Sequence, residues 1–89
     1  MRTKTKRSAT TLGIDLGDKR HEVCVLDGGG EVLEAKKVDN GRGALSRLAR
    51  DHPGARVVLE CGAQSPWVSR HLEGLGMEVL VANARKVRA

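Results

Sequence analysis

Short β-branched and apolar segments fill the first part of the chain and predict strands rather than helices. Three of them follow one another, at residues 10–16, 21–26 and 31–39. The sequence Asp27-Gly28-Gly29-Gly30 separates the last two and favours a hairpin turn, because glycine adopts positive φ without steric cost. The connections are short, so we expect an antiparallel meander whose polar third strand lies at a sheet edge.

After the meander, the apolar residues recur at the spacing of a helix. Asn40 is a suitable N-cap, and the apolar stripe that follows it consists of Ala44, Leu45, Leu48 and Ala49. The sequence His52-Pro53-Gly54 ends this predicted helix.

A second helix is predicted to begin at Ser65-Pro66, because proline suits the first helical position. Gly74 and Gly76 are expected to end it. Its apolar stripe consists of Trp67, Val68, His71, Leu72 and Leu75. Trp67 is expected to anchor this helix in the core.

Each predicted helix precedes a short apolar segment that reads as a strand, residues 55–60 and then residues 77–82. A strand that follows a crossover helix lies parallel to its neighbour. The sequence therefore predicts a mixed α/β sheet with strand order 3-2-1-4-5. Strands one to three are expected to be antiparallel, and strands four and five to run parallel to strand one. Asn83 is expected to cap a further helix.

The 89 residues allow one small domain, expected over residues 10–89 after a basic, disordered lead at residues 1–9. One Trp and no Tyr or Phe argue against modules that stack nucleic-acid bases on aromatic side chains. No apolar segment is long enough to cross a membrane, and none follows the basic N-terminus as in a secretory signal. We therefore expect a cytoplasmic protein. Cys24 and Cys61 lack metal-ligand spacing and are expected to be two buried, reduced thiols.

The formal net charge of +5 is concentrated at the two ends of the chain. Residues 8–84 hold nine basic residues against all eleven acidic ones, a formal charge of −2. The ends can bind nucleic-acid phosphates, or they can be a solvated tail and an ordinary basic helix start, and charge alone leaves both interpretations open. The basic residues concerned are Arg2, Lys4, Lys6, Arg7, Arg85, Lys86 and Arg88.

Two carboxylates lie where adjacent predicted strands end. Asp15 stands between Ile14 and Leu16 in a strand predicted to be central, and Glu60 follows the apolar run of strand four. An ionised carboxylate inside a sheet is costly unless a cation or hydrogen bonds compensate it. The two could share a Mg²⁺ ion, which favours oxygen ligands. Alternatively, Asp15 accepts hydrogen bonds from the following turn and Glu60 caps the next helix.

Several short motifs, in order, resemble the start of the RuvC-like domain of DEDD transposases of the insertion-sequence one-ten group, a ribonuclease H-like fold. The resemblance covers roughly residues 11–89. It is carried by Gly13-Ile14-Asp15-Leu16-Gly17, Asp27-Gly28, Gly30-Glu31-Val32, Leu59-Glu60-Cys61-Gly62, Trp67, Leu72, Leu75-Gly76, Val79, Val81-Ala82-Asn83, Arg85 and Val87.

The resemblance implies that Asp15 and Glu60 are the first two catalytic, metal-binding carboxylates of a DNA strand-transfer enzyme that uses Mg²⁺ or Mn²⁺. It also implies a guide RNA that pairs with the DNA. The family's last two aspartates lie beyond strand five, and neither Glu73 nor Glu78 can replace them. The chain is thus expected to be the front part of the catalytic domain and inactive alone. The family's serine nucleophile belongs to a second domain, so Ser8, Ser46, Ser65 and Ser69 are not assigned that role. The oligomeric state stays open, a homo-oligomer included.

The remaining polar candidates are expected to have structural roles. His21, His52 and His71 are expected to be surface or partly packed groups, and Asp18 a turn residue.

Two alternatives belong to other functional classes. The segment Ile14-Asp15-Leu16-Gly17 also resembles the first phosphate motif of actin-like ATPases and sugar kinases. That fold places Thr or Ser after the glycine, whereas this chain has Asp18, whose charge would repel phosphates. The other alternative is a non-catalytic nucleic-acid-binding module that acts through its basic ends.

Overall fold

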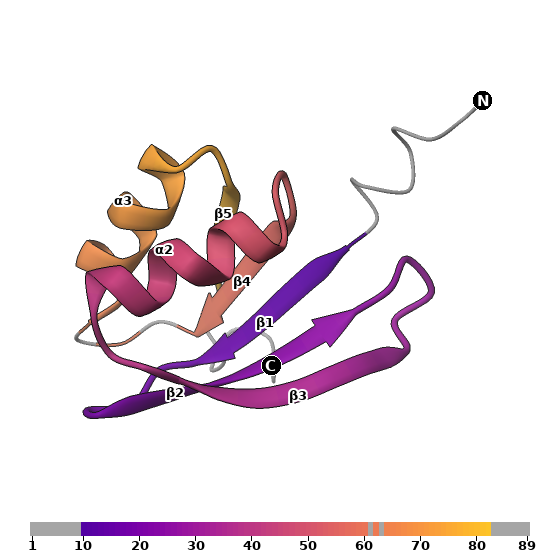
Figure 1. Cartoon of the computed structure of the whole chain (residues 1–89), viewed down its shortest axis with the longest axis horizontal. Coiled ribbons are helices and arrows are strands. Elements are labelled where there is room, and N and C mark those ends of the chain that lie inside the picture. Colours follow the sequence, from indigo (N-terminus) through magenta and orange to yellow (C-terminus); the bar gives the residue numbers. More distant parts are fainter. Residues whose placement is uncertain (1–9, 61, 63, 83–89) are drawn as a thin grey trace.

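A computed structural model describes residues 10–60, 62 and 64–82 of the chain, and Figure 1 shows the arrangement of their helices and strands. The first three strands are β1 (Thr11–Asp15), β2 (Arg20–Leu26) and β3 (Val32–Asp39). The second part of the fold consists of α2 (Arg42–Asp51), β4 (Arg56–Glu60), α3 (Ser65–Gly74) and β5 (Glu78–Ala82). The predicted order of elements is confirmed.

The five strands form one mixed sheet in the order β3-β2-β1-β4-β5, as predicted. β1 pairs antiparallel with β2, and β2 pairs antiparallel with β3, which lies at the edge. β4 pairs parallel with β1 on one side and with β5 on the other. β1 is therefore central, with the hairpin on one side and the two crossover strands on the other.

Both helices lie on the same face of the sheet (Figure 1). Their apolar stripes supply Leu45, Leu48, Ala49, Val68 and Leu72 to the core. Alternate strand residues point toward these helices, and they include Leu12, Ile14, Val23, Val25, Val57 and Leu59. Within the described part of the chain, no helix covers the opposite face of the sheet (Figure 1). The strand side chains that alternate with the core residues therefore point to that face, which is open to solvent.

The turn between β2 and β3 is a hairpin turn that contains glycine at positive φ, as predicted. Gly30 has φ +86°, a conformation that residues with a Cβ rarely adopt. The Asp27 carboxylate accepts the backbone N–H groups of Gly29 and Glu31 at 2.9 and 3.0 Å. These bonds satisfy the exposed donors of the turn and fix the hairpin between β2 and β3.

The structure corrects the predicted cap of the first helix. Gly41, not Asn40, is the N-cap residue of α2, and no side chain caps that helix. The Asn40 side chain turns instead toward the β1–β2 turn and the segment before α3. Asn40 therefore forms hydrogen bonds with residues distant in the sequence instead of the helix-capping bond that its position in the sequence favours.

The structure also corrects the predicted burial of Cys24, which is a free and exposed thiol. Its neighbours Val23 and Val25 are buried against the helices, so the alternation of a strand places Cys24 on the opposite, open face.

Trp67, which was expected to anchor α3 in the core, is only partly buried. It packs against the core, and the Arg42 guanidinium lies 5.9 Å from its ring centroid.

Some predictions concern residues outside the described ranges: the basic lead at 1–9, Cys61, the helix after Asn83, and the seven basic residues of the two ends. In the described part of the chain, no helix is long and apolar enough to cross a membrane.

Candidate metal centre

Asp15 and Glu60 are the last residues of two neighbouring parallel strands, β1 and β4. The register places Ile14 opposite Leu59, so the two carboxylates follow at the same level of the sheet. Ile14 and Leu59 both point into the core. Side chains alternate along a strand, so Asp15 and Glu60 both point to the open face. The structure thus brings the two predicted residues to the same edge and the same face of the sheet, at the ends of adjacent strands.

Both side chains are exposed. The ion pairs among the described residues join Arg20 to Asp39, Lys36 to Glu34 and Arg56 to Glu78, and none of them neutralises Asp15 or Glu60. Glu22 lies opposite Asp15 in the antiparallel register and adds a third negative charge on the open face. Like charges on adjacent strands repel one another, so a cation at this edge would be favoured.

The donor set fits one hard divalent cation. Both groups are carboxylates, and oxygen ligands suit Mg²⁺ and Mn²⁺ better than softer metals. Among residues 10–60, 62 and 64–82, no three His, Cys, Asp or Glu side chains are placed to hold a metal together, so Glu22 does not complete the set. Mg²⁺ retains several waters and is commonly held by one or two carboxylates. Asp15 and Glu60 would therefore hold a hydrated ion.

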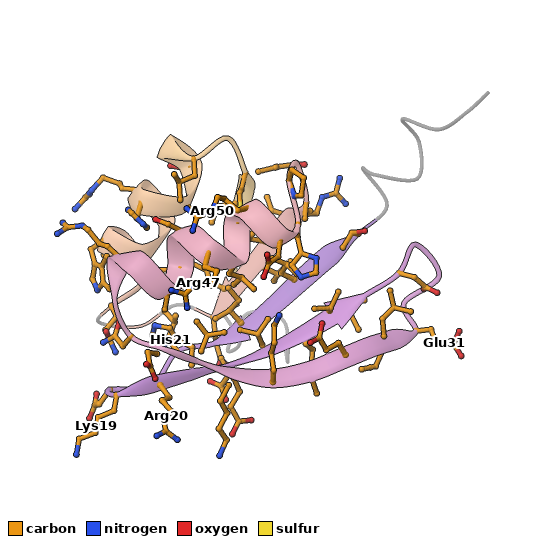
Figure 2. The ribbon with its side chains drawn as sticks, in the orientation of Figure 1. Lys19, Arg20, His21, Glu31, Arg47 and Arg50 are labelled. Carbon is orange, nitrogen blue, oxygen red and sulfur yellow. The ribbon has the colours of Figure 1, made fainter. Side chains whose placement is uncertain are left out.

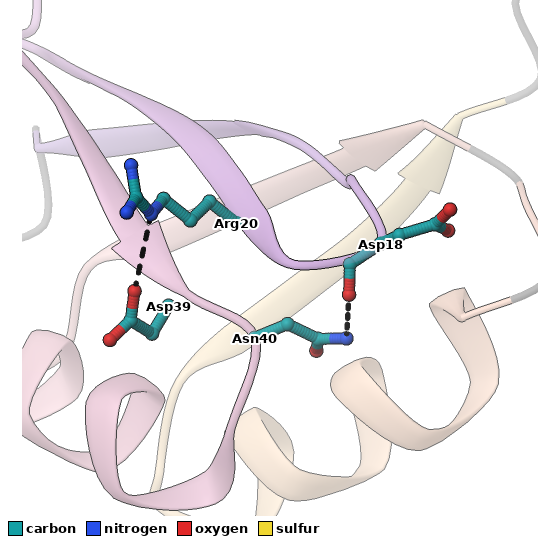
Figure 3. Close-up of polar contacts among 4 residues, drawn as sticks. All are labelled: Asp18, Arg20, Asp39 and Asn40. Carbon is teal, nitrogen blue, oxygen red and sulfur yellow. Dashed lines mark hydrogen bonds and ion pairs between the residues drawn. The ribbon is translucent and has the colours of Figure 1, made fainter.

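The turn after Asp15 depends on Gly17. A Cβ at this position would lie 2.2 Å from the backbone carbonyl oxygen of Arg20, so only glycine allows the chain to return this closely. Arg20 in turn forms an ion pair with Asp39 across the hairpin, at 3.6 Å (Figure 3). The Asn40 amide donates to the carbonyl oxygen of Asp18 at 2.8 Å (Figure 3). The β1–β2 turn is thereby held against the end of β3.

His21 is completely buried, which corrects the prediction of a surface or partly packed histidine. It points to the helix side of the sheet, whereas its neighbour Arg20 points away (Figure 2). The Gly17 N–H donates to His21 Nδ1 at 3.1 Å, so the hydrogen is on Nε2, which donates to Asn40 Oδ1 at 3.1 Å. Both imidazole nitrogens thus have a hydrogen-bond partner.

Gln64 links this cluster to the segment that follows Glu60. Its amide group donates to the carbonyl oxygen of Gly17, and its side-chain oxygen accepts a hydrogen bond from the Asn40 amide. A continuous chain of hydrogen bonds therefore connects the turn after Asp15 with the loop after Glu60.

A protein-family model described as a transposase, of the DEDD type and the insertion-sequence one-ten group, matches residues 12–89. The chain belongs to this transposase family. The match covers both predicted carboxylates and all five strands of the sheet except the first residue of β1, Thr11. No curated protein matches the sequence.

Two solved structures resemble the fold of this transposase chain. The RuvC structure of Thermus thermophilus aligns with a TM-score of 0.58 and 14% identity, over 83% of this chain and 61% of that one. A protein of unknown function with an actin-like ATPase fold, from Bacteroides thetaiotaomicron, aligns with a TM-score of 0.66 and 9% identity, over 90% of this chain and 35% of that one. At these identities the likeness concerns the fold, which is a ribonuclease H-like mixed sheet. The transposase chain spans less than two thirds of either structure.

Other candidates of the transposase chain lie away from the carboxylate edge. His52 and His71 are partly buried, as predicted, and His71 Nε2 lies 3.1 Å from Ser46 Oγ, between the two helices. Glu73 is in α3, and Glu78 is at the start of β5, paired with Arg56 at 3.3 Å. Glu78 thus lies at the opposite end of the β4–β5 pair from Glu60, which is opposite Ala82.

Sequence reasoning missed three neighbours of the site. The hairpin register that pairs Asp15 with Glu22 follows from the short turn, and counting back from it would have identified Glu22. The same alternation that buries Val23 and Val25 also buries His21. Gln64 gave no local signal, because its partner Gly17 is 47 positions away.

Proposed function

We propose that this chain is the front part of the catalytic domain of a metal-dependent DNA transposase, over residues 10–89, and that Asp15 and Glu60 are its first two metal-binding, catalytic carboxylates. The observation that carries the proposal is their position at the ends of adjacent parallel strands, on one face of the sheet. Membership of the transposase family supports it independently.

The role of the two carboxylates follows from their charge and position. Their oxygens would hold a Mg²⁺ or Mn²⁺ ion on the open face of the sheet, where a DNA phosphodiester can reach it without displacing the core. If such an ion is bound there, it would supply a Lewis acid and an activated water for phosphodiester cleavage. Asp15 and Glu60 would orient the ion, and the solvent positions in its shell would remain available to DNA. Since the 89 residues contain two of the family's four carboxylates, we expect this chain alone to cut no DNA.

DNA is the proposed substrate, and a guide RNA is the proposed partner of the full-length enzyme. A DNA substrate agrees with the cytoplasmic location expected from the sequence. The basic ends, Arg2 to Arg7 and Arg85 to Arg88, are proposed to bind phosphates, because the rest of the chain is nearly neutral.

A nucleotide-binding fragment is the second candidate, because a solved structure with an actin-like ATPase fold aligns with 90% of the chain. Two features of the first turn count against it. Asp18 follows Gly17 where the actin-like fold usually has Thr or Ser, and its negative charge would repel phosphates. The Gly17 N–H, a donor that a phosphate would need, already donates to His21.

The two candidates differ in the ligand they bind. We expect isothermal titration calorimetry to show binding of Mn²⁺ or Mg²⁺ and no binding of ATP. Loss of an outer-shell partner alone changes metal affinity about 10–100-fold, so Asp15→Asn and Glu60→Gln are each expected to weaken it by at least as much. Glu73→Gln, on α3, is the matched control and should leave the affinity unchanged. ATP binding together with an unchanged metal affinity in Asp15→Asn would favour the nucleotide-binding candidate.

A further inference from the structure

The pairing of β1 with β4 ends one residue before the two carboxylates. Its last recorded pair is Ile14 with Leu59, and Asp15 and Glu60 come next. Beyond them the two strands end: β1 is followed by the turn at Gly17, and α3 begins at Ser65. The sheet ladder alone therefore does not fix the distance between the two carboxylates.

Side chains behind the edge join the segments on which Gly17 and Gln64 lie. Gln64 donates to the carbonyl oxygen of Gly17, so the fourth residue after Glu60 is tied to the second residue after Asp15. Asn40 holds Gln64 from the other side by donating to its side-chain oxygen, and it also donates to the Asp18 carbonyl at 2.8 Å. The Asn40 backbone N–H donates to the Lys19 carbonyl at 2.9 Å, which fixes Asn40 itself against the same turn.

His21 anchors this arrangement in the core. It is fully buried in β2, accepts the Gly17 N–H at Nδ1 and donates from Nε2 to Asn40. Every hydrogen-bonding group of the imidazole is thus used, and the ring is held by the strand next to β1. An apolar side chain of similar size would leave the Gly17 N–H and the Asn40 oxygen without this partner, so the ring holds the turn as well as filling space.

We infer that His21, Asn40 and Gln64 form an edge brace that positions Asp15 and Glu60 for a shared cation. This inference rests on the proposed function of the two carboxylates. The three residues touch neither the ion nor DNA; they are positioning residues, which act by holding the backbone that carries the ligands. Groups that hydrogen-bond a metal ligand directly change metal affinity about 10–100-fold when they are lost, and the edge brace, which bonds neither carboxylate, is expected to act at the lower end of that range.

Gln64→Met and Asn40→Ala test the edge brace without introducing a charge. Both side chains are only partly buried, which favours folding of the variants. We expect each variant to weaken Mn²⁺ binding by about tenfold in calorimetry. In the metal-free protein, we expect faster hydrogen exchange at the Gly17 amide, because its turn loses a side-chain bond from Gln64 or Asn40. Ser46→Ala is the matched control: it removes a side-chain hydrogen bond between α2 and α3, away from the edge.

The edge brace is supported if Gln64→Met and Asn40→Ala bind Mn²⁺ more weakly than Ser46→Ala does. The comparison requires that all three variants lose a similar amount of melting temperature. The inference is wrong if both brace variants bind Mn²⁺ as Ser46→Ala does while Asp15→Asn loses binding. An unchanged affinity in Asp15→Asn contradicts the proposed metal site itself, so the two failures are distinguishable. If Gln64→Met does not fold, Asn40→Ala alone decides, by the same comparison of affinity with melting temperature.

Discussion

At the scale of single residues, two glycines of the same short motif have different structural roles. Gly17 has no room for a side chain, since a Cβ would lie 2.2 Å from a backbone oxygen of Arg20. Gly13, in the middle of β1, has nothing within 4 Å of the same position. Positive φ is not the cause at either residue, in contrast to Gly30. The requirement at Gly17 is therefore close approach of the backbone in the turn that follows Asp15.

We predict that Gly17→Ala lowers the free energy of unfolding by about 1–3 kcal/mol, because the clash is with backbone and the turn must move. Gly13→Ala is the matched control and should be neutral or stabilising by up to about 1 kcal/mol, since alanine restricts the unfolded chain. Urea denaturation of the two variants measures the difference. Equal effects would show that the turn at Gly17 tolerates a side chain.

At the scale of elements, local patterns were sufficient to predict the strand order and both helices. The crossover rule requires a helix before each parallel strand, α2 before β4 and α3 before β5. The apolar stripes of α2 and α3 identified those two helices. The position of Asp15 and Glu60 at neighbouring strand ends follows from the same rule.

Contacts between residues far apart in the sequence could not be predicted in this way. Asn40 has the residue type of a helix cap, but its partners are 22 and 24 positions away, in Asp18 and Gln64. Which bond forms depends on how the hairpin packs against the segment before α3, and no local pattern reports that packing. The buried state of His21 was predictable from strand alternation, but its two partners were not.

We predict that Leu45→Ala destabilises the fold by about 2–5 kcal/mol, because Leu45 is fully buried where α2 covers the sheet. Native domains have only about 5–15 kcal/mol of stability, and a chain of this size has little surplus. Arg47→Ala, exposed on the same helix (Figure 2), is expected to change stability by less than about 0.5 kcal/mol. Thermal unfolding followed by circular dichroism compares the two. A similar melting temperature for both variants would show that the apolar stripe of α2 does not hold the helix on the sheet.

At the scale of the whole molecule, the sheet divides the described residues into two sides with different roles. The helix side holds the core and the edge brace, and the open side carries Asp15, Glu22 and Glu60 at one end. This division allows a charged site to lie on a very small domain without a buried charge. The hairpin turn around Glu31 lies at the opposite end of the sheet from Lys19 and Arg20 (Figure 2).

The most direct test of a shared cation at Asp15 and Glu60 is to locate bound Mn²⁺ in the intact chain. Substoichiometric Mn²⁺ broadens the backbone amide signals nearest to it in a ¹H–¹⁵N spectrum. We predict that the signals of Asp15, Leu16 and Glu60 broaden first, that those of Gly28–Gly30 at the far end of the hairpin broaden last, and that Asp15→Asn abolishes the pattern. Broadening that begins elsewhere, at Asp39 or Glu73, or that is the same in Asp15→Asn, would contradict the account.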